Sequence, residues 1–288
     1  MNQMLETYAE TLSPGSRRSY VQAARRFARF SGGNLHHDRL LAYFRHLEAQ
    51  GYSPNTIRRY DMVAVRGLFR ANGVPWPLKA WELPTVSERD VYAPALHPEL
   101  VSRMVKAVKA GQVSPEDGAL VALAVVYGLR RVELASMTPD DLDVAPGLLC
   151  VRTAKRGRER VHIVPEAIQP HLACLRGPLT PRDVSAAYYR LERAAGIPRM
   201  PEVGWHAIRR SLTRGLLQAS VPEAIVRNFM RWKRSEGDML LRYFSTTVVG
   251  QDGQYLDPGR EDREVDEAVF KSHPFLPMWG DDRAPPKA

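Results

Sequence analysis

The chain has 288 residues, which is enough for about two domains at the usual ~100–200 residues per domain. A composition of 44% apolar and 25% charged residues is ordinary for a globular protein and excludes wholesale disorder. Cys150 and Cys174 are too few for a disulfide framework, so we expect a reduced, intracellular protein. No apolar run reaches the ~18 residues of a membrane span, and MNQMLETYAE lacks the features of a secretory signal. We therefore expect no membrane association and a cytoplasmic location, or a nuclear one for a eukaryotic source.

The charge pattern favours a polyanionic partner. The chain carries 41 Lys and Arg against 32 Asp and Glu, a formal net charge of +9. Residues 251–288 hold five basic and nine acidic residues, so this acidic tail leaves +13 on residues 1–250. Residues 16–70 contain eleven arginines and no lysine. Such a block, if folded, forms a surface that faces phosphates.

Helical periodicity predicts that this basic block is a bundle of three helices. Apolar residues recur at helical spacing over Ser16–Phe30, over Asp38–Gln50 and again after Ser53. The stretch 73–98 contains five prolines and no sustained periodicity, which is typical of a linker. We therefore expect a basic helical domain over residues 1–80 and a proline-rich linker over 81–97.

The rest of the chain predicts a second domain that is mostly helical with a small β-hairpin. Helices are expected to begin near Pro98, Ser114, Pro181, His206, Pro222 and Ser235. The helix from Ser114 is apolar almost all round, which places it at the centre of the core. Residues 148–165 alternate like two strands around a charged turn. The predicted fold class is mainly α with a small β-sheet (α+β), with this domain over 98–250 and the tail, containing one short helix, over 251–288.

Two motifs of the second domain contain an arginine with a polar neighbour three residues away. YGLRRVELASM places Arg130 and Glu133 at the end of the apolar helix, where a buried structural ion pair is the alternative to a functional role. WHAIRRS places His206 and Arg209 on one helical face. Two nitrogen donors on one face suit a bound oxyanion.

Two further motifs contain basic residues beside a turn or beside aromatic side chains. Lys155 lies in the hairpin turn, where a charge is usually only solvated. RNFMRWKRSEGDMLLRYFS embeds Trp232 and Tyr243 among basic residues. Aromatic side chains in such a setting either pack or stack on nucleotides.

The order of these motifs resembles the tyrosine recombinase family, also called phage integrases. The shared order is GLRxxE, a lysine in a strand turn, HxxR, a Trp flanked by basic residues and then a Tyr. The resemblance covers both domains, since TIRRYDMVAVRGLFRANGV is similar to the last helices of the family's core-binding domain. It implies a helical core-binding domain followed by a catalytic domain. The catalytic residues that it implies are Arg130, Lys155, His206, Arg209, Trp232 and Tyr243, with Glu133 supporting the first arginine.

Two features depart from the family pattern. Tyr243 comes eleven positions after Trp232, which is longer than the usual spacing, and Arg231 stands where the family has glycine. The longer spacing leaves Tyr255 as a rival nucleophile. We favour Tyr243, because Tyr255 lies in the turn-rich segment GQDGQYLDPG with no helix to direct it.

The resemblance implies that the tyrosine attacks a DNA phosphodiester. A phenol is a weak nucleophile at neutral pH, and His206 is expected to accept its proton. The planar guanidinium groups of Arg130 and Arg209 suit the charge of a pentavalent phosphate, and Lys155 would protonate the leaving 5′-oxygen. Trp232 can only donate its indole N–H. The 3′-phosphotyrosyl product preserves the bond energy, so neither metal nor ATP is expected as a cofactor.

These features together predict a site-specific DNA recombinase that acts on double-stranded DNA as a homotetramer through a Holliday junction. The predicted DNA-binding residues of the first domain are Arg17, Arg18, Arg25, Arg58, Arg59 and Arg66. Two alternatives remain, a catalytically inactive DNA-binding protein of the same architecture and a type IB topoisomerase-like enzyme. For the tail, packing on a neighbouring subunit and covering the core of its own domain are both open.

Overall fold

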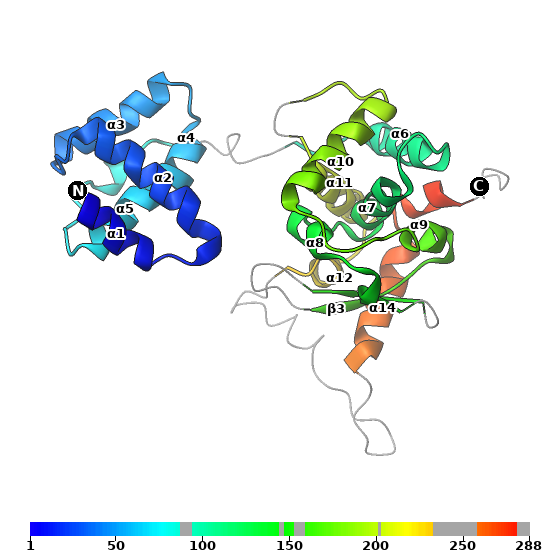
Figure 1. Cartoon of the computed structure of the whole chain (residues 1–288). Coiled ribbons are helices and arrows are strands. Elements are labelled where there is room, and N and C mark those ends of the chain that lie inside the picture. The colour runs from blue at the N-terminus through cyan, green and yellow to red at the C-terminus, as the bar shows by residue number, and fades with distance from the viewer. Residues whose placement is uncertain (87–93, 144–146, 153–158, 201–202, 233–257, 281–288) are drawn as a thin grey trace, which may run out of the picture. The chain divides into compact units, whose positions relative to one another are not determined.

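A computed structural model describes residues 1–86, 94–143, 147–152, 159–200, 203–232 and 258–280 (Figure 1). The chain divides into two compact units, Met1–Ala93 and Pro94–Ala288. The boundary between the units lies within the range 81–97, for which the sequence predicts a linker. Among the described helices, none combines the length and the hydropathy that a membrane crossing requires.

Unit 1 is a bundle of helices around one apolar core. Its elements are α1 (Asn2–Glu10), α2 (Pro14–Ser31), α3 (His37–Ala49), α4 (Pro54–Thr56), the π-helical turn η1 (Ile57–Asp61), α5 (Met62–Ala71) and the 3-10 turn η2 (Ala80–Glu82). The core is aromatic: the ring of Phe27 lies 5.3 Å from that of Tyr43 and 6.2 Å from that of Phe69. The three helices expected from periodicity are present. Helix α1 is additional, and it buries only Leu5 and Tyr8.

A buried ion pair joins the helices of unit 1. Asp61, at the end of η1, is fully buried and accepts hydrogen bonds from Arg26 Nη2 at 2.6 Å and from the Tyr43 hydroxyl at 3.2 Å. These contacts connect α2, α3 and η1, because each partner comes from a different element. Arg26 is therefore a structural arginine in a helix whose neighbouring arginines face solvent.

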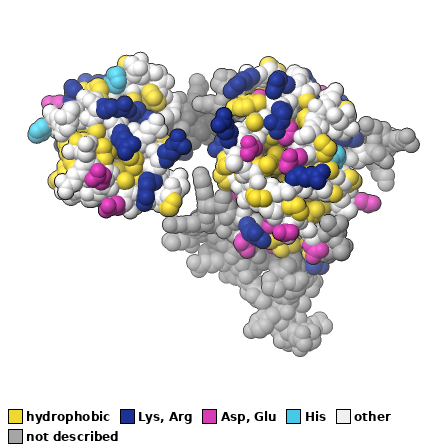
Figure 2. All heavy atoms as spheres, in the orientation of Figure 1, with side chains coloured by type: hydrophobic (Ala, Val, Ile, Leu, Met, Phe, Trp, Pro, Cys, Tyr) yellow, Lys and Arg dark blue, Asp and Glu magenta, His cyan; other side chains and the backbone are white. Residues whose placement is uncertain are grey.

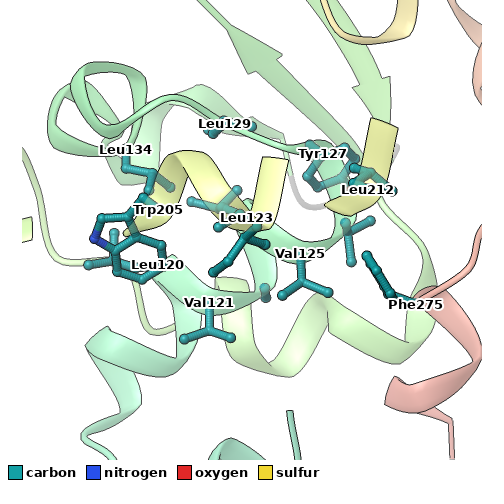
Figure 3. Packing of buried hydrophobic residues seen from close by; sticks show 14 of the residues in the cluster. Leu120, Val121, Leu123, Val125, Tyr127, Leu129, Leu134, Trp205, Leu212 and Phe275 are labelled. Carbon is teal, nitrogen blue, oxygen red and sulfur yellow. The ribbon is translucent and has the colours of Figure 1, made fainter. Parts of the chain in front are cut away.

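Unit 2 packs its helices around α7, whose residues from Asp117 to Tyr127 are all buried. Its helices and turns are α6 (Pro98–Lys109), α7 (Pro115–Tyr127), α8 (Arg131–Ser136), η4 (Pro139–Asp141), η5 (Glu166–Ile168), α9 (Gln169–Leu172), α10 (Pro181–Ala194), α11 (Trp205–Gln218), α12 (Glu223–Phe229), α14 (Pro258–Phe270) and η6 (Leu276–Trp279). Figure 3 shows Leu120 and Leu123 of α7 close to Trp205 of α11. The prediction of a central apolar helix is confirmed.

A small antiparallel sheet lies beside the helices of unit 2. The described strands β1 (Leu142–Asp143), β2 (Leu148–Val151) and β3 (Arg160–Ile163) pair in the order β1-β2-β3. In the predicted hairpin, Leu149 pairs with His162 and Val151 with Arg160. Strand β1 is additional to the two expected strands. The hairpin tip, residues 153–158 with Lys155, lies outside the described residues.

The described part of the acidic tail belongs to the core of unit 2. Helix α14 packs against β3 and α12. Val265, Val269, Phe275 and Trp279 are all buried in the same apolar cluster as α7. Residues 258–280 thus cover the core of their own domain.

Candidate active site

A glycine turn takes the chain out of the central helix and brings Arg130 to the site. Helix α7 ends at Tyr127, and Gly128 adopts a left-handed conformation with φ 59°. This conformation favours glycine, and a Cβ atom at Gly128 would lie 2.7 Å from Cε of Met230, so the methionine side chain would have to shift. Arg130 then serves as N-cap of the separate short helix α8. The expectation that Arg130 and Glu133 lie at the end of the apolar helix was wrong, because Gly128 ends that helix first.

Glu133 holds Arg130 at two points. The Glu133 carboxylate accepts the backbone N–H of Arg130 at 2.8 Å and Nη1 of its guanidinium at 2.5 Å. The side chain of Glu133 is fully buried, whereas 22% of the Arg130 side chain is exposed. Burial by itself raises the pKa of the Glu133 carboxyl, but Arg231 and Arg130 outweigh it and lower the pKa below its usual value. Glu133 therefore stays ionised and orients Arg130 toward the surface.

Arg209 is buried on α11 and binds two helix ends. Its guanidinium donates to the carbonyl of Gly128 after α7 and to the carbonyl of Met230 after α12. Burial, together with the charges of Arg231 and Arg130, lowers its pKa to about 9. Arg209 is thus still charged at neutral pH, within electrostatic reach of Arg130.

Of the other predicted site residues, the structure describes His206 and Trp232. His206 is exposed in the first turn of α11, one turn before Arg209. Trp232 is half-buried against the apolar core, directly after the end of α12. Lys155 and Tyr243, like the rival Tyr255, lie outside the described residues. The structure therefore brings together Arg130, Glu133 and Arg209, and it places His206 on the same helix as Arg209.

Arg231 also belongs to this cluster. The sequence indicated only that an arginine stands at this position where the family has glycine. It is 2% exposed and adopts a left-handed backbone with φ 54°. Its Nη2 lies 3.4 Å from the Glu133 carboxylate. Burial is the largest cause that lowers its pKa to about 10. This replacement of the family's glycine by arginine is the sequence signal that could have identified Arg231 as a site residue.

The cluster has an excess of positive charge. Within the described part of the chain, Arg130, Arg209 and Arg231 surround the single carboxylate of Glu133. The mutual repulsion of these guanidinium groups contributes to the lowered pKa values of Arg209 and Arg231. A bound oxyanion would relieve this repulsion, and guanidinium groups match the oxygens of a phosphate. The arrangement suits a phosphate group.

The predicted DNA-binding arginines of unit 1 lie on its surface. Arg17, Arg18, Arg25, Arg59 and Arg66 are exposed and Arg58 is half-buried. Arg18 and Arg25 line a groove of about 660 Å³ between α1 and α2, together with Arg29, which was not among the predicted residues. Figure 2 shows Lys and Arg side chains on the visible faces of both units. The groove is basic and open to solvent.

Comparison with known proteins identifies the class to which the chain belongs. The model of the phage integrase family matches residues 94–245, more than half of the 288-residue chain. The chain belongs to the phage integrase family. It is a tyrosine recombinase, as the order of its motifs predicts, and its mainly helical fold with a small sheet confirms the predicted fold class.

Individual proteins are similar to this chain in sequence or in fold. The chain is similar to tyrosine recombinase XerA of Thermococcus kodakarensis, at 27% identity over 237 residues that cover 75% of this chain and 80% of the relative. Its fold is similar to that of XerH site-specific recombinase bound to palindromic difH substrate, with a TM-score of 0.61, 17% identity and coverage of 76% and 73%. A lambda integrase dimer bound to a COC′ core site gives a TM-score of 0.60, 16% identity and coverage of 84% and 94%.

Proposed function

We propose that this tyrosine recombinase is site-specific and that it cleaves and rejoins duplex DNA through a 3′-phosphotyrosyl intermediate, without metal or ATP. The observation that carries the proposal is the cluster of Arg130, Arg209 and Glu133. Arg130 uses one side-chain N–H on Glu133, and Arg209 uses two on backbone carbonyls. A guanidinium has five N–H donors, so both arginines retain donors for the non-bridging oxygens of a phosphate.

The proposed division of roles follows the chemistry of each side chain. Tyr243 attacks the phosphorus, and His206 accepts the proton of the phenol. Arg130 and Arg209 stabilise the charge of the pentavalent phosphate. Their side chains need not reorganise during the reaction, because Glu133 already orients Arg130 and two backbone carbonyls already orient Arg209. Lys155 protonates the leaving 5′-oxygen. Trp232 donates its indole N–H to a phosphate oxygen and takes no part in proton transfer.

The proposed partner is duplex DNA with a specific recombination site, bound by a homotetramer. The arginine-lined groove of unit 1 supports the DNA partner, because exposed arginines neutralise phosphates regardless of sequence. The named relatives bound to difH and to a COC′ core site support the same partner. Base contacts, which would define the site, come in addition to these phosphate contacts.

The experiment is covalent trapping from a library. Full-length protein is incubated in EDTA, without nucleotide, with nicked duplexes of randomised sequence, and DNA that stays attached after denaturation is recovered and sequenced. We expect a consensus site for the wild type and for Tyr255→Phe, and no adduct for Tyr243→Phe at unchanged DNA affinity. Adducts that survive in Tyr243→Phe would overturn the assignment of the nucleophile. Binding without any adduct would instead favour the inactive DNA-binding alternative.

A further inference from the structure

A continuous series of buried polar contacts runs from the tail helix α14 to the arginine cluster. Asp266 of α14 is fully buried and accepts hydrogen bonds from Arg160 Nη2 at 2.8 Å and from the backbone N–H of Ile163 at 2.7 Å. Its carboxylate also lies 3.1 Å from Nδ1 of His162, another fully buried residue of β3. On its other side, Nε2 of His162 lies 2.8 Å from Nη1 of Arg231.

The direction of these hydrogen bonds is determined by chemistry. A guanidinium only donates, so Nε2 of His162 accepts from Arg231 and the ring proton lies on Nδ1. His162 then donates from Nδ1 to Asp266. Burial lowers the pKa of His162 to about 4, which keeps the ring neutral in this tautomer at neutral pH. The pair of His162 and Asp266 therefore presents one directed acceptor to Arg231.

Arg231 and Arg209 bind the ends of the same two helices. Arg209 donates to Gly128 and Met230, and Arg231 donates to the carbonyls of Tyr127 and Phe229, each at 3.2 Å. At each helix end, the carbonyl bound by Arg231 belongs to the last helical residue and the carbonyl bound by Arg209 belongs to the residue that follows it. Removal of Arg231 releases the carbonyls next to the acceptors of Arg209.

Arg231 also supports the other catalytic arginine through Glu133. Oε1 of the Glu133 carboxylate binds the guanidinium of Arg130 at 2.5 Å, and Oε2, which accepts the backbone N–H of Arg130, also lies 3.4 Å from Nη2 of Arg231. The left-handed backbone of Arg231 is a conformation that side chains other than glycine adopt at a cost. The position holds a large buried side chain in spite of that cost, and this side chain makes the contacts with Glu133, His162 and the two helix ends.

We propose that Arg231 is a positioning residue: it orients Arg130 through Glu133 and orients Arg209 through the ends of α7 and α12, while His162 and Asp266 direct it. Because Asp266 comes from α14, docking of the tail helix on β3 is part of the arrangement of the active site. This inference rests on the proposed function, in which Arg130 and Arg209 stabilise the reacting phosphate.

The test compares Arg231→Gly with the wild type on the consensus site recovered by covalent trapping. Glycine suits the left-handed backbone, so the variant is expected to fold, which its thermal unfolding checks. The single-turnover cleavage rate should fall by about 10- to 100-fold, as for a small misplacement of catalytic groups, with the DNA affinity unchanged within about twofold. Ser220→Gly is the matched control, because Ser220 is an exposed residue with φ 60°.

A second substrate separates positioning from a general structural role. A methylphosphonate at the scissile position lacks the non-bridging charge that the arginines stabilise, so Arg231→Gly should reduce its cleavage much less than that of the phosphodiester. An equal loss on both substrates, or a phosphodiester rate within twofold of wild type, would overturn the inference. Arg231→Lys retains the charge without the planar fork and should remain at least about fivefold slow on the phosphodiester; full recovery also contradicts the proposal.

The failure of this inference is distinguishable from failure of the proposed function. If wild-type protein forms no adduct on any DNA, the proposed function fails before Arg231 is tested. If the wild type cleaves and Arg231→Gly cleaves equally well, only the positioning role is lost.

Discussion

The carboxylate of Glu133 binds both the backbone N–H and the guanidinium of Arg130, at 2.8 Å and 2.5 Å. One buried side chain therefore determines where α8 begins and where Arg130 is directed. The same carboxylate is the counter-charge of Arg231, and its electrostatic interaction reaches Arg209. The placement of the partly exposed Arg130 guanidinium thus depends on the ionised side chain of Glu133, which has no exposure to solvent.

Neutralisation of Glu133 should lower both stability and activity. Glu133→Gln retains an acceptor for Arg130 but leaves buried guanidinium charge uncompensated, so we expect a loss of about 3–5 kcal/mol in the free energy of unfolding. The cleavage rate should fall at least about tenfold, because Arg130 loses its charged partner. Urea unfolding and single-turnover cleavage measure the two effects.

Glu192→Gln is the matched control for this variant. Glu192 is 4% exposed, and burial is the largest cause that raises the pKa of its carboxyl. Burial therefore makes the charge of Glu192 less favourable than that of an exposed carboxylate, and removal of the charge should change stability and activity little. Equal losses in the Glu133 and Glu192 variants would contradict the special role of Glu133.

Gly128→Ala should be more destabilising than an alanine at another left-handed glycine. A left-handed alanine costs about 1–2 kcal/mol, and at Gly128 the new methyl group also meets Met230 and Leu212 in the core. Gly111 has φ 66° with nothing within 4 Å of an added Cβ, so Gly111→Ala measures the conformational cost alone. We expect Gly128→Ala to lose about 1–3 kcal/mol more than Gly111→Ala in urea unfolding.

The activities of these two glycine variants should differ as well. The Gly128 carbonyl accepts from Arg209, so Gly128→Ala should slow cleavage, whereas Gly111→Ala should cleave at the wild-type rate. A normal cleavage rate in Gly128→Ala would mean that the position of Arg209 does not depend on this turn.

The stability of unit 2 should decrease on mild acidification. His162 and His273 are buried, and burial lowers the pKa of each from 6.5 to about 4. Between pH ~6.5 and ~4 the unfolded chain binds protons at these histidines that the folded chain does not. The contribution of the two neutral histidines to the free energy of unfolding is therefore fully present above pH ~6.5 and is lost as the pH falls toward ~4. The slope is at most about 1.4 kcal/mol per pH unit for each histidine.

The variant His273→Asn tests how much of this pH dependence of stability comes from His273. Nδ1 of His273 accepts the backbone N–H groups of Phe275 and Leu276, and Nε2 donates to the carbonyl of Val126. Protonation of Nδ1 would break the first two contacts. Urea unfolding at several values between pH 7.5 and 4.5 should give a shallower decline for the variant than for the wild type, and identical slopes would exclude His273 as a contributor.

Two adjacent arginines of α2 should affect different properties. Arg25 is exposed and lines the groove of unit 1, so Arg25→Ala should weaken DNA binding and reduce the dependence of log affinity on log salt by about 1. Arg26 pairs with buried Asp61, so Arg26→Ala should lower stability instead. Salt titrations of binding and thermal unfolding of both variants distinguish these outcomes, and a stability loss confined to Arg25→Ala would reverse the assignment.

The sequence by itself determined the class of the protein and most of its local structure. Periodicity predicted α2, α3, α10 and α11, since one buried face imposes a helical repeat on neighbouring residues, and the apolar run that follows Ser114 predicted α7. The motif order predicted the family that the match over 94–245 confirmed. Helix α1 was not predicted, because two buried residues in nine are too few for a periodic signal. The catalytic roles of Arg130, His206 and Arg209 remain predictions until the variants are measured.

Only the tertiary structure decided which residues share the site with Arg130 and Arg209. Arg231, His162 and Asp266 come from three separate parts of the chain, and each side chain alone is compatible with an ordinary surface position. The tail helix α14 likewise had two open interpretations, until its packing on β3 placed Asp266 beside His162. Such contacts depend on how distant segments are brought together in space, whereas a sequence pattern reports only the neighbours along one element. Burial then determines the charge and the hydrogen-bond direction of each group, and burial belongs to the fold as a whole.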